Sequence, residues 1–176
     1  MIRLSTDRLT LRNFHPDDWQ ELLELAIRYQ ATEWAKYDHP WPTTEEEVKG
    51  MAAWLATEEG FLAVIVRSTG RLIGLLHIGR KKEEEAARVH GLGYVFHPDV
   101  HGQGYATEAC RAGIAQIFGP WEADEITTGT HPDNKPSVRL LHRLGLQRVT
   151  EGEYALTRAQ WQAQTSAEKD TAEDAG

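Results

Sequence analysis

The loop His101-Gly102-Gln103-Gly104 is the stretch of this sequence best suited to chemistry. It follows the apolar residues 94–96 and leads into a helical pattern that begins near Tyr105. Glycine permits backbone conformations and close approaches that a Cβ would obstruct. The first N–H groups of a helix lack partners within the helix and lie at the positive end of its dipole. The loop therefore favours an anion such as a phosphate, although such a turn is more often simple chain reversal.

The elements that position this loop follow from hydrophobic periodicity and turn chemistry. Apolar residues that alternate or run continuously predict strands, and apolar residues at i, i+3 and i+4 predict helices. The turn Ser68–Arg71 joins two strands into a hairpin, and the charged run 81–85 is interpreted as a solvated turn. The expected strands are 9–14, 61–66, 72–78, 90–96, 125–130, 146–149 and 154–156, and the expected helices open near Pro16, Thr44, Tyr105 and Pro136.

The segment Ala31–Pro42 has no clear period but carries Trp34, Tyr37 and Trp41. An irregular loop rich in aromatic residues can line a substrate cleft. Aromatic residues can equally anchor such a loop to the core. Both interpretations remain open from the sequence.

The composition is that of one globular domain. The chain has 176 residues, of which 40% are hydrophobic, enough for a substantial core. We expect residues 1–164 to form this domain and residues 165–176, which lack large apolar side chains, to form a disordered acidic tail. The net charge of −8 argues against nucleic-acid and membrane partners. Without an apolar run of membrane-spanning length or a signal-peptide core, the expected location is cytoplasmic.

The single cysteine, Cys110, lies within an apolar helical pattern. One cysteine excludes an intramolecular disulfide and a cysteine-rich metal site. We therefore expect Cys110 to be a small buried hydrophobe and expect no metal cofactor.

Three local motifs, in this order, resemble one protein family. Thr6–Arg12 is similar to its opening strand, Gly93–Ala109 to its acetyl-CoA signature, and Asn134–Leu146 to its third block. The chain resembles the GNAT-type N-acetyltransferases, specifically the RimJ/RimL-like branch that acetylates protein N-termini and assorted amines. The resemblance spans about residues 4–156. It implies an α/β (α+β) single-domain GNAT fold, with a mixed, mostly antiparallel twisted sheet of about six to seven strands, about four helices and a V-shaped splay between the two central strands.

The resemblance implies that acetyl-CoA is the acyl donor. Backbone N–H groups of the glycine loop would hold the pyrophosphate, and the edge of the preceding strand would pair with the amides of the pantetheine arm. One strand N–H would stabilise the oxyanion of the attacked thioester. Asn134 would contact the pantetheine from the other side. The implied coenzyme-binding residues are Tyr94, Val95, Phe96, His101, Gly102, Gln103, Gly104, Tyr105, Ala106, Thr107, Asn134 and Ser137.

The chain departs from the family pattern at chemically important positions. His101 stands where the family loop usually begins with Gln or Arg, and it either contacts phosphate or faces solvent. Leu141 occupies the position of a tyrosine that many relatives use to protonate the departing thiolate. Ser137, three residues after Asn134, matches a serine common in RimL-like proteins. Its hydroxyl either acts on the sulfur or only bonds the backbone.

The base that deprotonates the acceptor ammonium is not identified by the sequence. Gly91 and Gly129 stand where relatives often carry a carboxylate. Glycine has no side chain to accept a proton, so neither residue can be the base. His77, His90 and His131 lie on or beside strands that approach the expected cleft. Each histidine also has a structural or surface interpretation, and a water-mediated path remains open.

The expected activity is direct transfer of acetyl from coenzyme A to a bound primary amine, without a covalent enzyme intermediate. The expected acceptor is a protein N-terminal amine of the ribosomal-protein kind. One alternative is a small amine such as an antibiotic, a polyamine or an amino acid. Another is a non-catalytic acyl-CoA-binding regulatory or interaction module. The expected assembly is a monomer or a homodimer.

Overall fold

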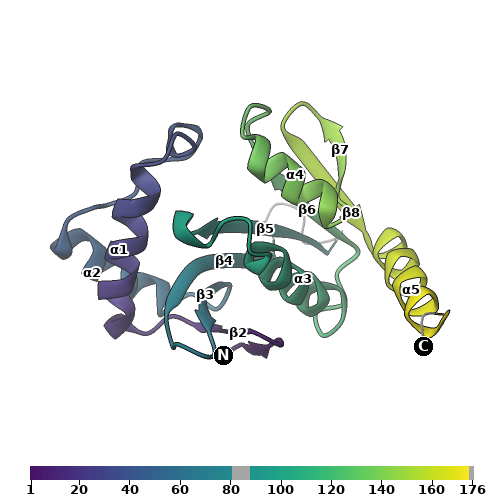
Figure 1. Ribbon diagram of the computed structural model, residues 1–176, viewed down its shortest axis with the longest axis horizontal. Helices are drawn as coiled ribbons and strands as arrows, with labels where there is room; N and C mark the ends of the chain where they lie inside the picture. Colours follow the sequence, from purple (N-terminus) through teal and green to yellow (C-terminus); the bar gives the residue numbers. More distant parts are fainter. Residues whose placement is uncertain (81–87, 175–176) are drawn as a thin grey trace.

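An eight-stranded sheet runs through the molecule in the order β1-β2-β3-β4-β5-β6-β8-β7. The computed structural model describes residues 1–80 and 88–174, shown in Figure 1. Neighbouring strands are antiparallel except β5 and β6, which are parallel. The strands are β1 Arg3–Ser5, β2 Leu9–Asn13, β3 Phe61–Val66, β4 Leu72–Arg80, β5 Val89–Phe96, β6 Glu125–Gly129, β7 Gln147–Thr150 and β8 Glu153–Thr157.

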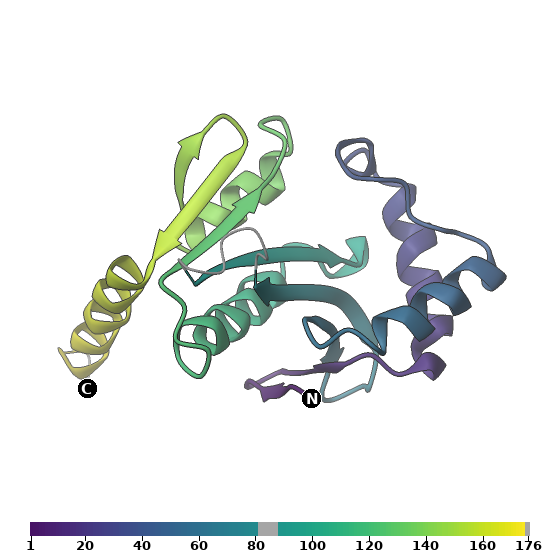
Figure 2. The ribbon, with the colours of Figure 1, turned by 180° about the vertical axis from the view of Figure 1, so that it is seen from behind.

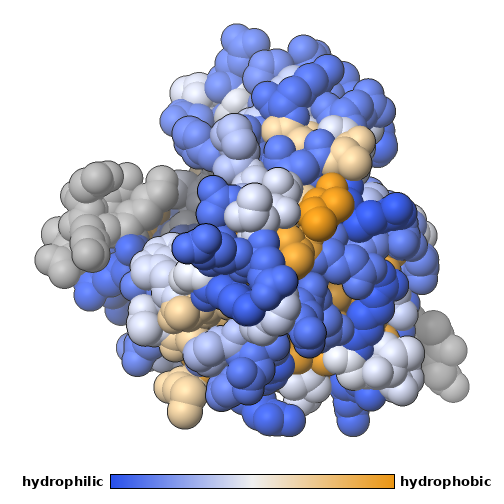
Figure 3. Space-filling view, turned by 90° about the vertical axis from the view of Figure 1, so that its left-hand side faces the viewer, coloured by the Kyte–Doolittle hydropathy of each residue, from blue (hydrophilic) through white to orange (hydrophobic). Residues whose placement is uncertain are grey.

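Helices cover both faces of the sheet (Figures 1 and 2). In the described part of the chain these are α1 Trp19–Gln30, α2 Glu45–Leu55, α3 Tyr105–Phe118, α4 Lys135–Arg143 and α5 Arg158–Asp174. Leu22 and Val48 of α1 and α2 pack with Leu75 on one face. Ile114 of α3 and Leu141 of α4 belong to the core on the other face. The molecular face in Figure 3 is mostly hydrophilic, and its apolar residues form small separate areas.

The α/β fold confirms the predicted architecture. All the predicted strands and the four predicted helices form, and β1 is one strand beyond the expected six to seven. The Thr44 side chain accepts a hydrogen bond from the backbone N–H of Glu47 and caps α2, the helix predicted to open near Thr44. Gly145 follows α4 with a left-handed φ of 85°, which suits a helix end. Among the described residues, no helix combines the length and apolar character needed to cross a bilayer.

The C-terminal segment differs from the expectation of a disordered tail. Helix α5 continues to Asp174, so residues 165–174 are helical. Trp161 anchors the start of this helix by stacking on Phe118 at 5.2 Å between ring centroids, and Ala, Gln and Glu in its sequence favour a helix. Gln164 and Glu168 add contacts to the Gly145 carbonyl and to Arg111. Residues 175–176 and the predicted turn 81–85 lie outside the described residues. The domain boundary at residue 164 stays a prediction.

The divergence of β5 from β6 produces the predicted V-shaped splay. Among the described residues, the two strands pair over Val89–Gly91 and no further. Beyond this point β5 remains paired with β4 as far as Phe96. Thr128 Oγ1 of β6 donates a hydrogen bond of 2.6 Å to the carbonyl of Leu92. The remaining edge of β5 is therefore available to a ligand.

Candidate active site

A cleft of about 1030 Å³ lies at the splay between β5 and β6. Most residues predicted to bind coenzyme line it. These are Tyr94, Val95, Phe96, His101, Gly102, Gly104, Ala106, Thr107, Asn134 and Ser137. Gln103 and Tyr105 do not line it, because Gln103 Nε2 donates to the carbonyl of Asp99 and the Tyr105 ring lies beneath the Arg8 guanidinium.

The glycine loop presents backbone donors to this cleft. Gly102 and Gly104 adopt left-handed φ values of 76° and 81°, a region that favours glycine. Throughout the described part of the chain, no hydrogen-bond acceptor is found for the backbone N–H groups from Gly102 to Thr107. These groups surround the N-terminus of α3, where the helix dipole adds positive potential. A cluster of such donors at a helix N-terminus is the arrangement that anions favour.

Arg8, which directly precedes β2, holds the glycine loop in this conformation. Its Nη1 donates to the carbonyl of Gln103 at 2.9 Å, and its Nε donates to Glu108 at 2.6 Å. The Thr6 hydroxyl also donates to Glu108. Burial alone would raise the pKa of Glu108, but the hydrogen bonds from Thr6 and Arg8 together hold that pKa below its ordinary value. The sequence motif Thr6–Arg12 was recognised, but this anchoring role was not predicted.

Glu108→Gln is expected to lower the free energy of unfolding by about 1 kcal/mol, because Arg8 and Thr6 lose an anionic acceptor. Acetyl-CoA affinity should fall severalfold because the loop loses its support. Thermal unfolding and calorimetric titration measure the two effects. The folded-state pKa of Glu108 is lowered, so its contribution is present above the unfolded pKa. It is lost as the pH falls through the folded pKa, where wild type and variant should converge.

Glu45→Gln is the control for Glu108→Gln. Glu45 forms an exposed i,i+4 pair with Lys49 on α2. Removal of such a pair should change stability by less than about 0.5 kcal/mol. Equal effects of the two substitutions would contradict the anchoring role of Glu108.

His101 turns back toward the strand that precedes it. Its Nε2 lies 3.3 Å from the carbonyl oxygen of Phe96. The residue is exposed at the rim of the cleft. An Nε2–H that donates to Phe96 leaves Nδ1 as an acceptor in the neutral ring. In that tautomer the Nε2–H of His101 is engaged with Phe96 and is not directed at a phosphate.

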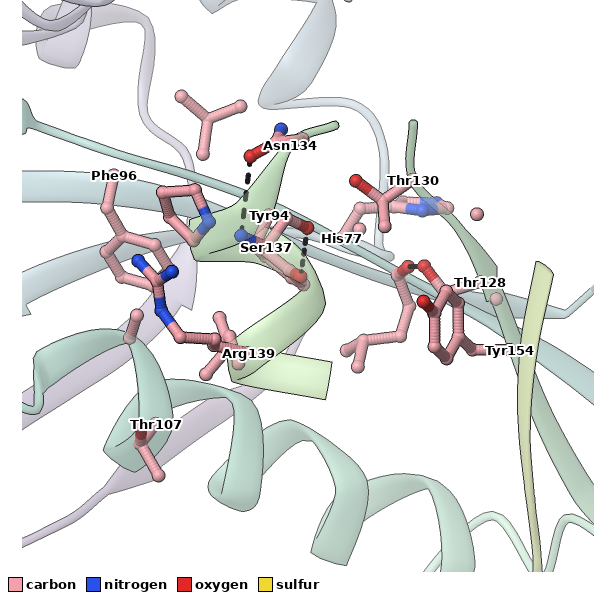
Figure 4. Close-up of a pocket in the computed structure, with 18 of the residues that line it drawn as sticks. His77, Tyr94, Phe96, Thr107, Thr128, Thr130, Asn134, Ser137, Arg139 and Tyr154 are labelled. Atoms are coloured by element: carbon pink, nitrogen blue, oxygen red, sulfur yellow. Dashed lines mark hydrogen bonds between the residues drawn. The ribbon is translucent and has the colours of Figure 1, made fainter. Parts of the chain in front are cut away.

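Ser137 and Asn134 lie together at the start of α4 (Figure 4). The Asn134 side chain accepts a hydrogen bond of 3.3 Å from the backbone N–H of Ser137. The Ser137 hydroxyl lies 2.8 Å from the hydroxyl of Tyr94. Leu141, at the position of the family tyrosine, is fully buried and does not line the cleft. The sequence proposed Ser137 as a catalytic residue but did not predict its tyrosine partner.

Of the three histidines considered as a base, His77 is the one that lines the cleft. Burial lowers the pKa of His77, so its imidazole is neutral near pH 7. His90 is 6% exposed and packs against Trp121, with ring centroids 5.4 Å apart. His131 stacks on Tyr37 at 4.4 Å. Neither His90 nor His131 is among the residues that line the cleft, and a role of either as a base stays a prediction.

The aromatic segment between α1 and α2 serves both of the roles considered. Trp34 lines the cleft, which fits the substrate-cleft interpretation. Trp41 packs with Tyr29 and the core beneath α1 and α2, which fits the anchoring interpretation. Tyr37 reaches across to His131 on the loop after β6. The segment thus forms the wall of the cleft opposite α4.

Cys110 is fully buried, as predicted, and burial raises the pKa of its thiol. Cys110 does not line the cleft. A covalent acyl intermediate on this thiol has no route to the site.

Comparisons with known proteins agree with this geometry. The acetyltransferase (GNAT) domain family matches residues 8–147. A protein of Bacillus subtilis named an uncharacterised N-acetyltransferase is 29% identical over 151 residues, which cover 84% of each chain. A GNAT-family acetyltransferase structure from Bacillus anthracis has a TM-score of 0.77 at 22% identity and covers 90% of this chain and 99% of its own. The ribosomal-protein-S5-alanine acetyltransferase of Vibrio fischeri has a TM-score of 0.75 at 14% identity and covers 92% of this chain and 99% of its own.

Proposed function

Because the chain belongs to the GNAT family of acetyltransferases, we propose that it transfers acetyl from acetyl-CoA directly to the α-amine of a polypeptide. The observation that carries this proposal is the cleft between β5 and β6. Unpaired loop N–H groups at one end suit a diphosphate, and the unpaired edge of β5 suits the pantetheine amides. Asn134 and Ser137 lie on the opposite side, where the thioester would sit.

The acid–base groups of the cleft favour an α-amine over a lysine side chain. An α-amine has an ordinary pKa of about 8, whereas that of lysine is about 10.4. At neutral pH the neutral fraction of an α-amine is thus about two hundredfold larger. The neutral imidazole of His77 is a modest base, sufficient for a proton that leaves readily. The shared fold with the Vibrio fischeri enzyme, named for ribosomal protein S5 alanine, supports the same choice.

An acetyl-transfer screen tests this proposal. Peptides with free α-amines and N-terminal Ala or Ser are compared with the same peptides blocked at the α-amine but carrying an internal lysine. A polyamine and an aminoglycoside complete the panel, and product masses and fragmentation locate the acetyl group. The expected result is acetylation at free α-amines alone. Acetylation of the small amines without the peptides, or of the blocked peptides at lysine, would reject the proposed acceptor.

A further inference from the structure

The Ser137 hydroxyl is joined to a second hydroxyl that comes from the central sheet. Tyr94 projects from β5 to the first turn of α4, and the two oxygens are 2.8 Å apart (Figure 4). Both residues line the cleft. The cap of α4 uses the backbone N–H of Ser137 rather than its side chain. The hydroxyl of Ser137 is therefore not consumed by helix formation.

The relative acidity of the two hydroxyls favours one direction of their hydrogen bond. Either oxygen can be the donor at this distance, and because a phenol is a stronger acid than an aliphatic alcohol, the favoured orientation is the one in which Tyr94 donates and Ser137 accepts. Burial raises the pKa of Tyr94, which keeps the phenol protonated through neutral and mildly alkaline pH. The proton of Ser137 is then free to be donated into the cleft. Two hydrogen bonds in series polarise each other.

We propose that Tyr94 is a positioning residue that directs the Ser137 hydroxyl toward the sulfur of coenzyme A and strengthens it as a hydrogen-bond donor. The proposal rests on the proposed acetyl transfer and on the role of Ser137 in it. The acceptor nitrogen bonds to the carbonyl carbon, and the carbon–sulfur bond breaks with its electron pair left on sulfur. The nitrogen loses one proton and the sulfur gains one. The products are an amide and a free thiol, and both hydroxyls end uncharged.

This arrangement explains how the chain manages without a tyrosine on α4. The side chain at that position, Leu141, is buried in the core beneath the helix. Tyr94 instead brings a phenol from the strand to the first turn of the same helix, one turn before Leu141. The phenol acts through Ser137 rather than on the substrate directly.

A mutant cycle in kcat tests the proposal, with free thiol release measured at saturating peptide. Tyr94→Phe should lower kcat about tenfold, the effect of one lost hydrogen bond, with little change in the KM for acetyl-CoA. In the Ser137→Ala background Tyr94→Phe should cause no further loss, because it acts through that hydroxyl. Wild-type kcat in Tyr94→Phe, or an equal tenfold loss in both backgrounds, would overturn the proposal.

Tyr37→Phe is the matched control for removal of a phenol hydroxyl. Tyr37 is not among the residues that line the cleft, and in the described part of the chain its hydroxyl makes no hydrogen bond. The phenylalanine ring preserves the stack on His131. This variant should retain wild-type kcat.

A second measurement does not depend on the acceptor. The thiol of bound coenzyme A is titrated by thiolate absorbance, and the signal of the desulfo-coenzyme A complex is subtracted to remove tyrosine and Cys110. Hydrogen-bond donation favours the thiolate, so the thiol pKa should be about one unit lower in wild type than in Tyr94→Phe or Ser137→Ala. Equal pKa values would reject the role of Tyr94 even if peptides are acetylated. If no peptide is acetylated but the thiol pKa of bound coenzyme A is still lower in wild type than in the variants, only the proposed acceptor is rejected.

Discussion

Gly104→Glu is expected to abolish the thermal stabilisation that acetyl-CoA gives the wild-type protein. Gly104 has a left-handed φ of 81°, and an added Cβ would lie 3.3 Å from Arg8 Nη2. A side chain here strains the loop and disturbs the residue that holds it. The glutamate also adds negative charge beside the N–H groups that would hold the pyrophosphate. We expect kcat/KM for acetyl-CoA to fall at least about a hundredfold, measured beside thermal shift with and without acetyl-CoA.

Gly70→Glu separates backbone strain from loss of the anion site. Gly70 has a comparable left-handed φ of 75° in the turn between β3 and β4, with no atom within 4 Å of the added Cβ. The same strain arises there, away from the cleft. Gly70→Glu should lower the melting temperature but keep the stabilisation by acetyl-CoA. An undiminished response in Gly104→Glu would refute the phosphate-site assignment.

Ser137→Ala is expected to lower kcat about a hundredfold with little change in the KM for acetyl-CoA. The substitution removes the hydroxyl that we propose to face the thioester. It retains the backbone N–H that bonds Asn134, so α4 should keep its cap. The loss therefore belongs to the chemical step and not to folding. Steady-state kinetics and a circular-dichroism melt measure the two separately.

Ser68→Ala provides the control for Ser137→Ala, because Ser68 is exposed in the turn between β3 and β4. Its kinetics should match the wild type. If Ser137→Ala raises the KM for acetyl-CoA while kcat is unchanged, the hydroxyl contributes to binding and not to the departure of sulfur.

Local patterns were sufficient to predict most of the secondary structure and the glycine loop that leads into α3. The alternation of β2 and the helical period of α3 each depend on residues close in sequence. The left-handed turns at Gly102 and Gly104 are likewise local, because only glycine adopts them without strain. The helix at residues 165–174 differs from the expected disorder because Ala, Glu and Lys favour a helix even where large apolar residues are absent. The contact of Trp161 with Phe118 could not be foreseen.

Which of the histidines lies at the cleft depends on strand register, that is, on which residues of β4 and β5 lie opposite each other. His77 of β4 lies opposite Gly93 of β5. Because Gly93 has no side chain, the imidazole ring of His77 can face the cleft. His90 lies on β5 at the opposite parity and packs against Trp121. A shift of one residue in register would exchange these faces. The sequence does not encode that register in any short segment.

The order of elements and the glycine loop before α3 could thus be predicted from the sequence itself, because their determinants lie within a few residues of one another. The contacts between side chains far apart in the sequence could not be predicted in this way. Tyr94 and Ser137 are separated by 43 residues, and Arg8 and Glu108 by 100, yet each pair is hydrogen-bonded. Their contact depends on how α3 and α4 pack against the sheet, and packing geometry is a property of the whole fold.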